Sequence, residues 1–156
     1  MKLSRIVRES LIFPRIEAAS KTDVLRQMSR AFLSEFPQLE AEQLYDQLSK
    51  RESLSSTGIG SGVAIPNAKL EGVSGHVAAF GRSPVGVDFD AIDGKPVHLI
   101  FLILSPQQST ESHLKVLARI SKFLHDTIFR EKLYTSDNAK AIYDAILEKD
   151  HSDEKI

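Results

Sequence analysis

The eight residues Val97–Leu104, with the sequence VHLIFLIL, form the most apolar run in the chain. A run of this length that stays apolar on both alternating positions beyond His98 is typical of a strand covered on both faces. Pro106 lies just beyond the run and ends it, because proline has no N–H to donate to a neighbouring strand. His98 lies at the start of the strand, and this position favours a structural or rim role over a role as a ligand-binding residue. The run therefore predicts the central strand of a buried sheet.

Further strands are expected on the N-terminal side of this run. Residues 76–82 (HVAAFGR) and 86–89 are interpreted as two antiparallel strands, because the intervening Ser83-Pro84-Val85 is typical of a turn. Residues 63–65 (VAI) form a short apolar strand, which Pro66 ends or leaves at the edge of the sheet.

Helical periodicity lies on both sides of these strands. Ser20 and Asp23 form a capping box ahead of a helix that Pro37 ends. Its buried stripe recurs at three- and four-residue steps: Val24, Leu25, Met28, Phe32 and Phe36. Other helices are expected over 40–52, from Ser109 or Thr110 to Leu124 with Leu114, Leu117 and Ile120 as apolar positions, over 127–134 and over 138–148. Residues 3–14 fit a short helix followed by a strand.

This order of elements predicts one α/β domain over residues 1–150, with a mixed parallel and antiparallel sheet and helices on both faces. A length of 156 residues suits a single domain. Residues 151–156 are expected to be a polar tail, within a C-terminal stretch KDHSDEKI that frays.

Composition excludes several classes of function. The formal net charge of -1 gives no electrostatic case for nucleic acid or an anionic membrane as partner. The absence of cysteine rules out disulfides and thiolate metal sites, and we expect neither a metal nor a cofactor. The N-terminal MKLSRIVRESLIF interrupts its apolar residues with charges, so neither a signal peptide nor a membrane span is expected. A cytoplasmic location follows as an expectation.

The candidate functional stretch is RESLSSTGIGSGVAIPNAK, residues 51–69. Three hydroxyls, at Ser55, Ser56 and Thr57, precede glycines on alternate positions, including Gly58 and Gly60. Glycine lets the backbone approach another group closely, so such a loop can present N–H groups to an anion. Arg51 precedes the loop with donors suited to phosphate, although a cation in the last turn of a helix also has a purely structural explanation.

His113 is the second candidate site residue. It shares a helical face with Val116, Leu117 and Ile120, yet it lies in the first turn, beside free backbone N–H groups. Taken by itself, a histidine in this position is more often a structural residue with its hydrogen bonds satisfied at the start of a helix than a functional one.

The stretch resembles the active-site segment of fructose/mannitol-type enzyme IIA domains of the phosphoenolpyruvate-dependent phosphotransferase system, and of their nitrogen-regulatory, PtsN-like branch in particular. That family follows the pattern R-E-x-x-x-S-T-G-I-G-x-G-[IV]-A-I-P-H. The matching residues here are Arg51-Glu52, Ser56-Thr57-Gly58-Ile59-Gly60 and Gly62-Val63-Ala64-Ile65-Pro66. A second segment is similar at Ser105-Pro106, His113-Leu114 and Leu117-Ala118, and a third at 90–97. The resemblance implies the same α/β fold.

The last residue of the family pattern is the histidine that accepts the phosphoryl group, and here it is Asn67. The resemblance implies that Arg51, His113, Ser55, Ser56, Thr57, Gly58 and Gly60 support this position. The nitrogen lone pair of an amide is delocalised into its carbonyl, so Asn67 is no nucleophile. Phosphoryl transfer to position 67 is therefore expected to be absent. The chain is then expected to act as, or to mimic, the unphosphorylated state of such a domain.

Three readings of this departure stay open. The chain is a natural regulator that has lost phosphorylation, or an engineered His→Asn variant of a working domain, or His113 itself accepts the phosphoryl group. A rival class is an anion- or protein-binding module unrelated to phosphotransfer. The resemblance implies two kinds of partner, the phosphocarrier protein of the system and a regulatory target protein.

Overall fold

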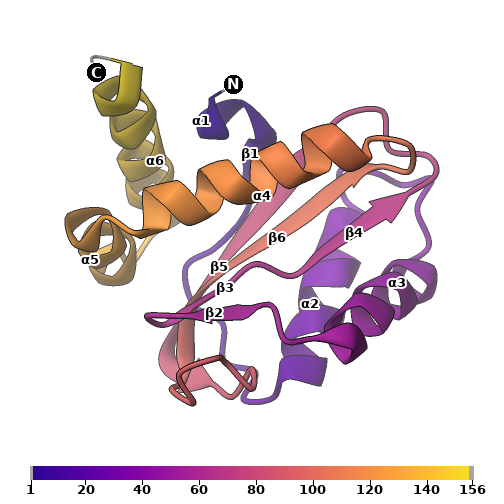
Figure 1. Ribbon diagram of the computed structural model, residues 1–156, viewed down its shortest axis with the longest axis horizontal. Helices are drawn as coiled ribbons and strands as arrows, with labels where there is room; N and C mark the ends of the chain where they lie inside the picture. The colour runs from indigo at the N-terminus through magenta and orange to yellow at the C-terminus, as the bar shows by residue number, and fades with distance from the viewer. Residues whose placement is uncertain (1, 155–156) are drawn as a thin grey trace.

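A six-stranded mixed sheet forms the centre of the protein, whose computed structural model describes residues 2–154 (Figure 1). The strand order is β1-β5-β6-β3-β2, and β4 also pairs with β6. β6 runs parallel to β3 and β4 and antiparallel to β5, whereas β1 is parallel to β5 and β2 antiparallel to β3. The strands are β1 (Val7–Phe13), β2 (Gly58–Gly60), β3 (Val63–Ala64), β4 (Asn67–Leu70), β5 (Val77–Val87) and β6 (Val97–Pro106).

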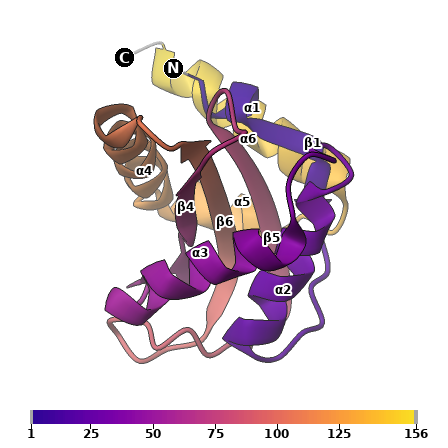
Figure 2. The same cartoon turned by 90° about the vertical axis from the view of Figure 1, so that its right-hand side faces the viewer.

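Helices cover both faces of this sheet, as the sequence predicted. One face carries α2 and α3, and the other carries α4, α5 and α6 (Figure 2). The helices are α1 (Leu3–Ile6), α2 (Lys21–Phe32), α3 (Ala41–Leu54), α4 (Thr110–Leu124), α5 (Thr127–Thr135) and α6 (Ala139–Glu154). The side chain of Ser20 accepts a hydrogen bond from the Asp23 N–H at 3.1 Å, which confirms half of the predicted capping box.

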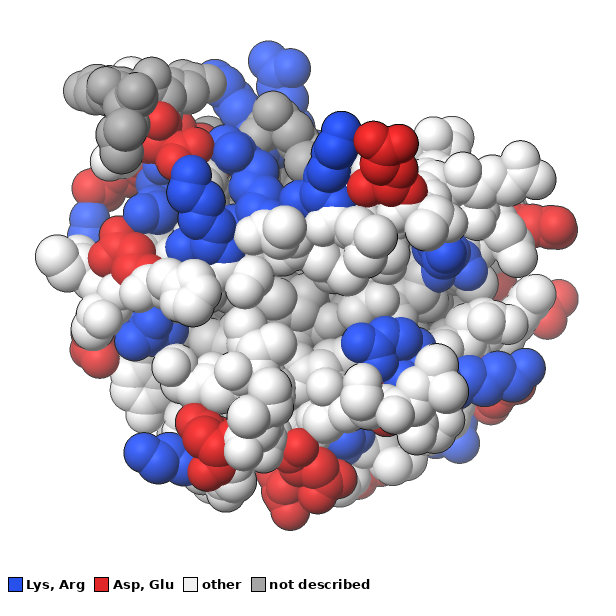
Figure 3. Space-filling model, in the orientation of Figure 1, with Lys and Arg blue, Asp and Glu red and all other residues white. Residues whose placement is uncertain are grey.

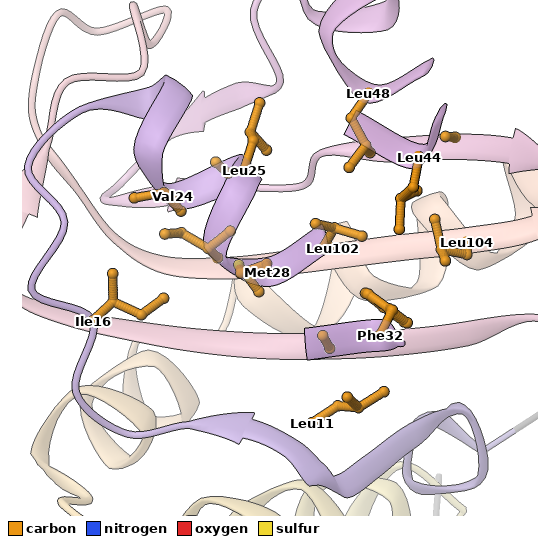
Figure 4. Close-up of a cluster of buried hydrophobic side chains, with 14 of the residues drawn as sticks. Leu11, Ile16, Val24, Leu25, Met28, Phe32, Leu44, Leu48, Leu102 and Leu104 are labelled. Atoms are coloured by element: carbon orange, nitrogen blue, oxygen red, sulfur yellow. The ribbon is translucent and has the colours of Figure 1, made fainter. Parts of the chain in front are cut away.

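The apolar run in β6 separates two hydrophobic clusters, because successive side chains of a strand point to opposite faces. Ile100, Leu102 and Leu104 pack into the cluster beneath α2 and α3. Figure 4 shows Leu102 and Leu104 facing the side chains of those helices. The intervening Leu99, Phe101 and Ile103 pack against the α4–α6 side. Every side chain from Leu99 to Leu104 is at most 3% exposed, so β6 is the doubly covered strand that its sequence predicted.

The two strands predicted over residues 76–82 and 86–89 are one strand, β5, so the turn predicted at Ser83-Pro84-Val85 is wrong. The pairing with β6 shifts register between Arg82 and Val87, and β1 pairs with β5 only as far as Gly81. Pro84 is tolerated because it lies in this irregular, partly unpaired stretch. Gly86 lies in the same irregular stretch and has a φ of +98°.

Residues 63–70 form one edge of the sheet in two pieces. β3 pairs with Leu99 and Ile100, and β4 resumes parallel pairing at Ile103. The break falls at Pro66, which has no N–H but whose carbonyl accepts from the Ile103 N–H at 2.9 Å. The sequence predicted β3, but not β4 or the short strand β2 in the glycine-rich loop.

Two helix ends also differ from expectation. α2 ends at Phe32, before the predicted stop at Pro37, and the Ser34 hydroxyl donates to the Ala31 carbonyl there, a local bond that competes with a further helical turn. Leu114, predicted as part of the apolar stripe of α4, is 60% exposed, and Val116 and Phe123 are buried instead.

The part of the C-terminal stretch KDHSDEKI that the structure describes is helical and not frayed. α6 continues to Glu154, and residues 155–156 of the predicted tail lie outside the described residues. Asp150 is 2% exposed and accepts from the N–H groups of Leu3 and Ser4 at 2.9 and 2.7 Å. A carboxylate on α6 thus caps the first turn of α1, which ties the stretch just before the predicted tail to the N-terminal end of the protein.

Candidate functional site

Asn67 faces the first turn of α4 because of its position in the strand alternation. Val63 and Ile65 face the α4 side, so Asn67, two residues further, faces it too. By the same period, Ser105 continues the face of Phe101 and Ile103 on β6. His76, just before β5, continues the face of Ala78. Three neighbouring strand ends therefore bring an amide, a hydroxyl and an imidazole together beneath α4.

These groups are joined by a continuous series of contacts to His113 on α4. The Nε2 atom of His113 lies 3.1 Å from Oδ1 of Asn67, whose Nδ2 donates to the Ile65 carbonyl at 2.8 Å. On its other side, Nδ1 of His113 lies 2.7 Å from the Ser105 hydroxyl. That hydroxyl is also 2.7 Å from Nδ1 of His76. His113 is 6% exposed and Asn67 5%, so both polar ends of each side chain are satisfied inside the protein.

The environment of His113 keeps its imidazole neutral. Burial, with the positive charges of Lys69 and Arg51 nearby and that of His76 once acid protonates it, lowers the pKa of His113 from 6.5 to about 4. Burial also lowers the pKa of the half-buried His76. At neutral pH both histidines are therefore uncharged.

This pKa makes the free energy of unfolding depend on pH. Between pH 6.5 and about 4, His113 is protonated in the unfolded chain but not in the folded chain. Acidification through this window therefore favours unfolding. The shift corresponds to a loss of up to about 3 kcal/mol, complete below the folded pKa. We expect His113→Gln to remove that part of the slope in denaturant titrations at a series of pH values, and the exposed His125→Gln to keep it. Equal slopes in the two variants would contradict the assignment.

The surface next to Asn67 is hollowed and positively charged. A cavity of about 530 Å3 lies between α3, β4 and α4, and a second of about 290 Å3 adjoins it. Asn67 and Arg51 line both, and His113 lines the first. The first is also lined by Lys50 and Lys69. Figure 3 shows this hollow below α4, with basic side chains beside it. The predicted trio of Arg51, Asn67 and His113 therefore converges on one shallow site.

The cations of this site have no acidic neighbours. Within residues 2–154, no carboxylate lies within ion-pair distance of Lys50, Arg51 or Lys69, and no Asp or Glu lines either cavity. Arg51 donates to the Ser55 carbonyl at 2.9 Å, and Lys69 donates to the Thr110 hydroxyl at 3.0 Å. Their positive charge is thus left for an anion from outside the protein.

The hydroxyl and glycine loop is largely occupied by internal hydrogen bonds. Thr57 is buried, and both its N–H and its hydroxyl donate to the Glu52 carboxylate. The Ser56 hydroxyl donates to the Phe89 carbonyl and accepts from the Gly58 N–H. Ser55 is exposed, and Gly60 takes a positive φ in β2. Ser56 and Thr57 line the smaller cavity, but Gly58 and Gly60 line neither.

Sequence reasoning matched Glu52 and Ser105 to the family motifs but gave them no role in the site, and it missed four other residues that complete the site: Lys50, Lys69, His76 and Ser112. A two-residue period extended from Phe101 reaches Ser105, and one extended from Ile65 reaches Lys69. The same period extended back from Ala78 gives the direction of His76, but its contact with Ser105 also depends on which strands are neighbours.

His98 lies away from this site and makes structural contacts, one of the two roles (structural or rim) expected for it. Its Nδ1 is 2.8 Å from the Ser83 carbonyl, and its ring packs edge-on against Tyr134. Among residues 2–154 there is no group of three His, Asp or Glu side chains that could hold a metal ion, and no helix long and apolar enough to cross a membrane.

Known proteins share this fold and much of this sequence. The family described as "Phosphoenolpyruvate-dependent sugar phosphotransferase system, EIIA 2" matches residues 5–149. A nitrogen regulatory protein from Pseudomonas aeruginosa is 34% identical over 148 residues, which make up 95% of this chain and 96% of that protein. The crystal structure of the nitrogen regulatory protein IIA-Ntr from Neisseria meningitidis superposes with a TM-score of 0.86 at 35% identity, covering 92% of this chain and 98% of that one.

A third similarity concerns the fold alone. The mannitol enzyme IIA of Escherichia coli, solved in complex with phosphorylated mannitol enzyme IIB, superposes with a TM-score of 0.75 at 21% identity, covering 91% of this chain and 99% of that one. The resemblance to nitrogen-regulatory enzyme IIA domains is thus confirmed by sequence and by fold, and a module unrelated to the phosphotransferase system is excluded. The chain belongs to the EIIA 2 family of the phosphoenolpyruvate-dependent sugar phosphotransferase system.

Proposed function

We propose that this protein is a regulatory enzyme IIA domain that docks phosphotransferase proteins without accepting their phosphoryl group, and so stays in the unphosphorylated state. The observation that carries the proposal is a carboxamide, Asn67, at the acceptor position of an otherwise intact cationic site. The family match over residues 5–149 supports a domain that spans 1–150.

The chemistry at position 67 supports a silent acceptor. Phosphoryl transfer between histidines needs an imidazole nitrogen with a free lone pair to attack phosphorus. The amide of Asn67 has none, and its Nδ2 is already a donor to the Ile65 carbonyl. The cations would still attract a phosphoryl group. We assign Arg51 to this role, with Lys69 beside it, and we keep Ser55, Ser56, Thr57, Gly58 and Gly60 as the predicted phosphate-binding loop.

The partner proposed for the site is the phosphocarrier protein of the system, and a regulatory target protein is proposed to read the unphosphorylated state. Both would place the chain in the cytoplasm. The solved complex of mannitol enzyme IIA with phosphorylated enzyme IIB supports a docking surface on this fold. Leu54 lines the larger cavity and is 82% exposed, and Ile59 lines the smaller one and is 41% exposed. The anion site therefore lies beside apolar surface that a protein partner could cover.

The docking proposal predicts a charge-dependent affinity. Lys69→Gln keeps a polar side chain but removes one of the unpaired cations, and we expect its dissociation constant for the phosphorylated phosphocarrier protein to rise roughly fivefold, about 1 kcal/mol. The measurement is a titration followed by the amide signals of the isotopically labelled chain, which should move around Asn67, Arg51 and Lys69.

The control for this titration is Lys140→Gln, which removes an exposed lysine on α6 that pairs with Asp144. Its affinity should equal that of the unmodified chain. If the perturbed signals fall elsewhere, or if both lysine variants weaken binding equally, the cationic cavity is not the docking site.

A further inference from the structure

The contacts that end on Asn67 permit one direction of hydrogen bonding. Because Nδ2 of Asn67 donates to the Ile65 carbonyl, the atom that faces His113 is the acceptor Oδ1. The Nε2 atom of His113 must therefore carry a proton. A neutral imidazole carries only one proton, so Nδ1 of His113 is an acceptor, and the Ser105 hydroxyl donates to it.

The same reasoning continues outward to the surface. The single proton of the Ser105 hydroxyl is used on His113, so Ser105 can only accept from Nδ1–H of His76. In neutral His76 the Nε2 atom is then an acceptor, which lies 3.0 Å from the Ser112 hydroxyl. The donors of His76, Ser105 and His113 all point toward Asn67, whereas the Ser112 hydroxyl also has the Ser109 carbonyl as an acceptor at 3.2 Å.

We infer that His76, Ser105 and His113 form a polarised relay in which His76, acting through Ser105, is a positioning residue that holds His113 as its Nε2–H tautomer against Asn67. His113 and Ser105 are 6% and 0% exposed, whereas His76 and Ser112 reach solvent. The relay thus links the floor of the cavity to the protein surface. It gives His76 and Ser105 a role that the phosphotransfer motif does not assign.

The relay decides what His113 can do in the cavity. Its Nε2 carries a proton and its only lone pair, on Nδ1, accepts from Ser105, so neither nitrogen is free to attack phosphorus. Reversing the relay would place a lone pair on Nε2. That state requires the Asn67 amide to turn over, which sets its Oδ1 against the Ile65 carbonyl, two acceptors facing each other. The relay therefore keeps His113 from replacing the missing acceptor, a consequence that rests on the proposed function.

The tautomers can be measured directly on the unmodified chain. Long-range proton–nitrogen correlation spectra of histidine-labelled protein, recorded slightly above neutral pH, separate protonated from unprotonated ring nitrogens. We expect His113 as the Nε2–H tautomer and His76 as the Nδ1–H tautomer. The second result is the sharper one, because an unconstrained histidine in water is mainly the Nε2–H tautomer. An Nε2–H tautomer at His76 would overturn the relay.

Two serine variants test which contact sets the tautomer of His76. Ser105→Ala removes the acceptor for Nδ1–H, and we expect most of the His76 population to revert to Nε2–H, with Ser105→Thr restoring Nδ1–H. Ser112→Ala removes only the outer hydroxyl of an exposed residue and should leave Nδ1–H in place. His125 and His151, both exposed, are the internal controls whose spectra should not change. If Ser105→Ala leaves His76 unchanged, or Ser112→Ala reverts it, the relay as proposed is wrong.

This experiment needs no donor protein. If the tautomers are as expected and the chain nevertheless accepts phosphate at another residue, the relay stands and the silent-acceptor function fails. If the tautomers differ and the chain still takes no phosphate, the function stands without the relay.

Discussion

Asn67→His is expected to turn a chain that takes no label into one that takes close to one phosphoryl group per molecule from phosphoenolpyruvate, enzyme I and the phosphocarrier protein. The imidazole supplies the missing lone pair, which attacks phosphorus while the bond from phosphorus to the donor nitrogen breaks. Its surroundings are already in place. His113 lies 3.1 Å from the present side chain as a hydrogen-bond donor, and Arg51 lines the same cavity. The label should be lost in acid and kept in alkali, as for phosphohistidine.

Two controls make this gain specific. Asn67→Gln enlarges the side chain without adding a nucleophile and should stay unlabelled. Adding Arg51→Gln to Asn67→His removes a cation that neutralises charge in the transition state, and we expect labelling to slow roughly a hundredfold. If Asn67→His folds but stays unlabelled, Arg51 and His113 do not have the supporting roles assigned to them.

Glu52→Ala is expected to lower the free energy of unfolding by about 3–4 kcal/mol, through loss of a buried charged network. The Glu52 side chain is 5% exposed and accepts from Lys21 at 3.0 Å, from the Thr57 N–H at 2.9 Å and from the Thr57 hydroxyl. Alanine leaves two buried donors of Thr57 without an acceptor and the ammonium of Lys21 without this partner. The network joins α2, α3 and the loop beside the cavity, so the loop should loosen as well.

Chemical denaturation measures this loss, and two further variants show its origin. Glu52→Gln keeps the shape and one acceptor oxygen and should cost about 1–2 kcal/mol, because it mainly removes the charge. Asp144→Ala breaks the exposed pair with Lys140 on α6 and should stay within about 0.5 kcal/mol of the unmodified chain. A loss of similar size in Glu52→Ala and Asp144→Ala would show that Glu52 is not an anchor of the loop.

The fold was predictable wherever a local pattern agreed with the tertiary structure. The apolar run of β6 indicated a doubly covered strand, and it is one. Prediction failed where tertiary pairing overrode local signals. Ser83-Pro84 is typical of a turn, but β5 passes through it because β6 continues alongside and a register shift absorbs the proline. β4 went unnoticed since Asn67–Leu70 becomes a strand only by pairing with the end of β6.

The candidate site was predictable only through the family resemblance. Arg51 and His113 are 62 positions apart in the printed sequence, and only the matched motifs indicated that both lie beside Asn67. The alternation along β6 and β4 could have added Ser105 and Lys69. His76 could not be found in this way, because its contact with Ser105 depends on β5 lying next to β6.

The central claim is that position 67 cannot accept a phosphoryl group, and the most direct test is the intact mass of the unmodified chain after incubation with an excess of phosphorylated phosphocarrier protein at neutral pH. We predict no gain in mass, while Asn67→His in the same experiment gains the mass of one phosphoryl group. If the unmodified chain gains that mass, another residue is the acceptor, and the protein is a working phosphoryl carrier rather than a regulator held in the unphosphorylated state.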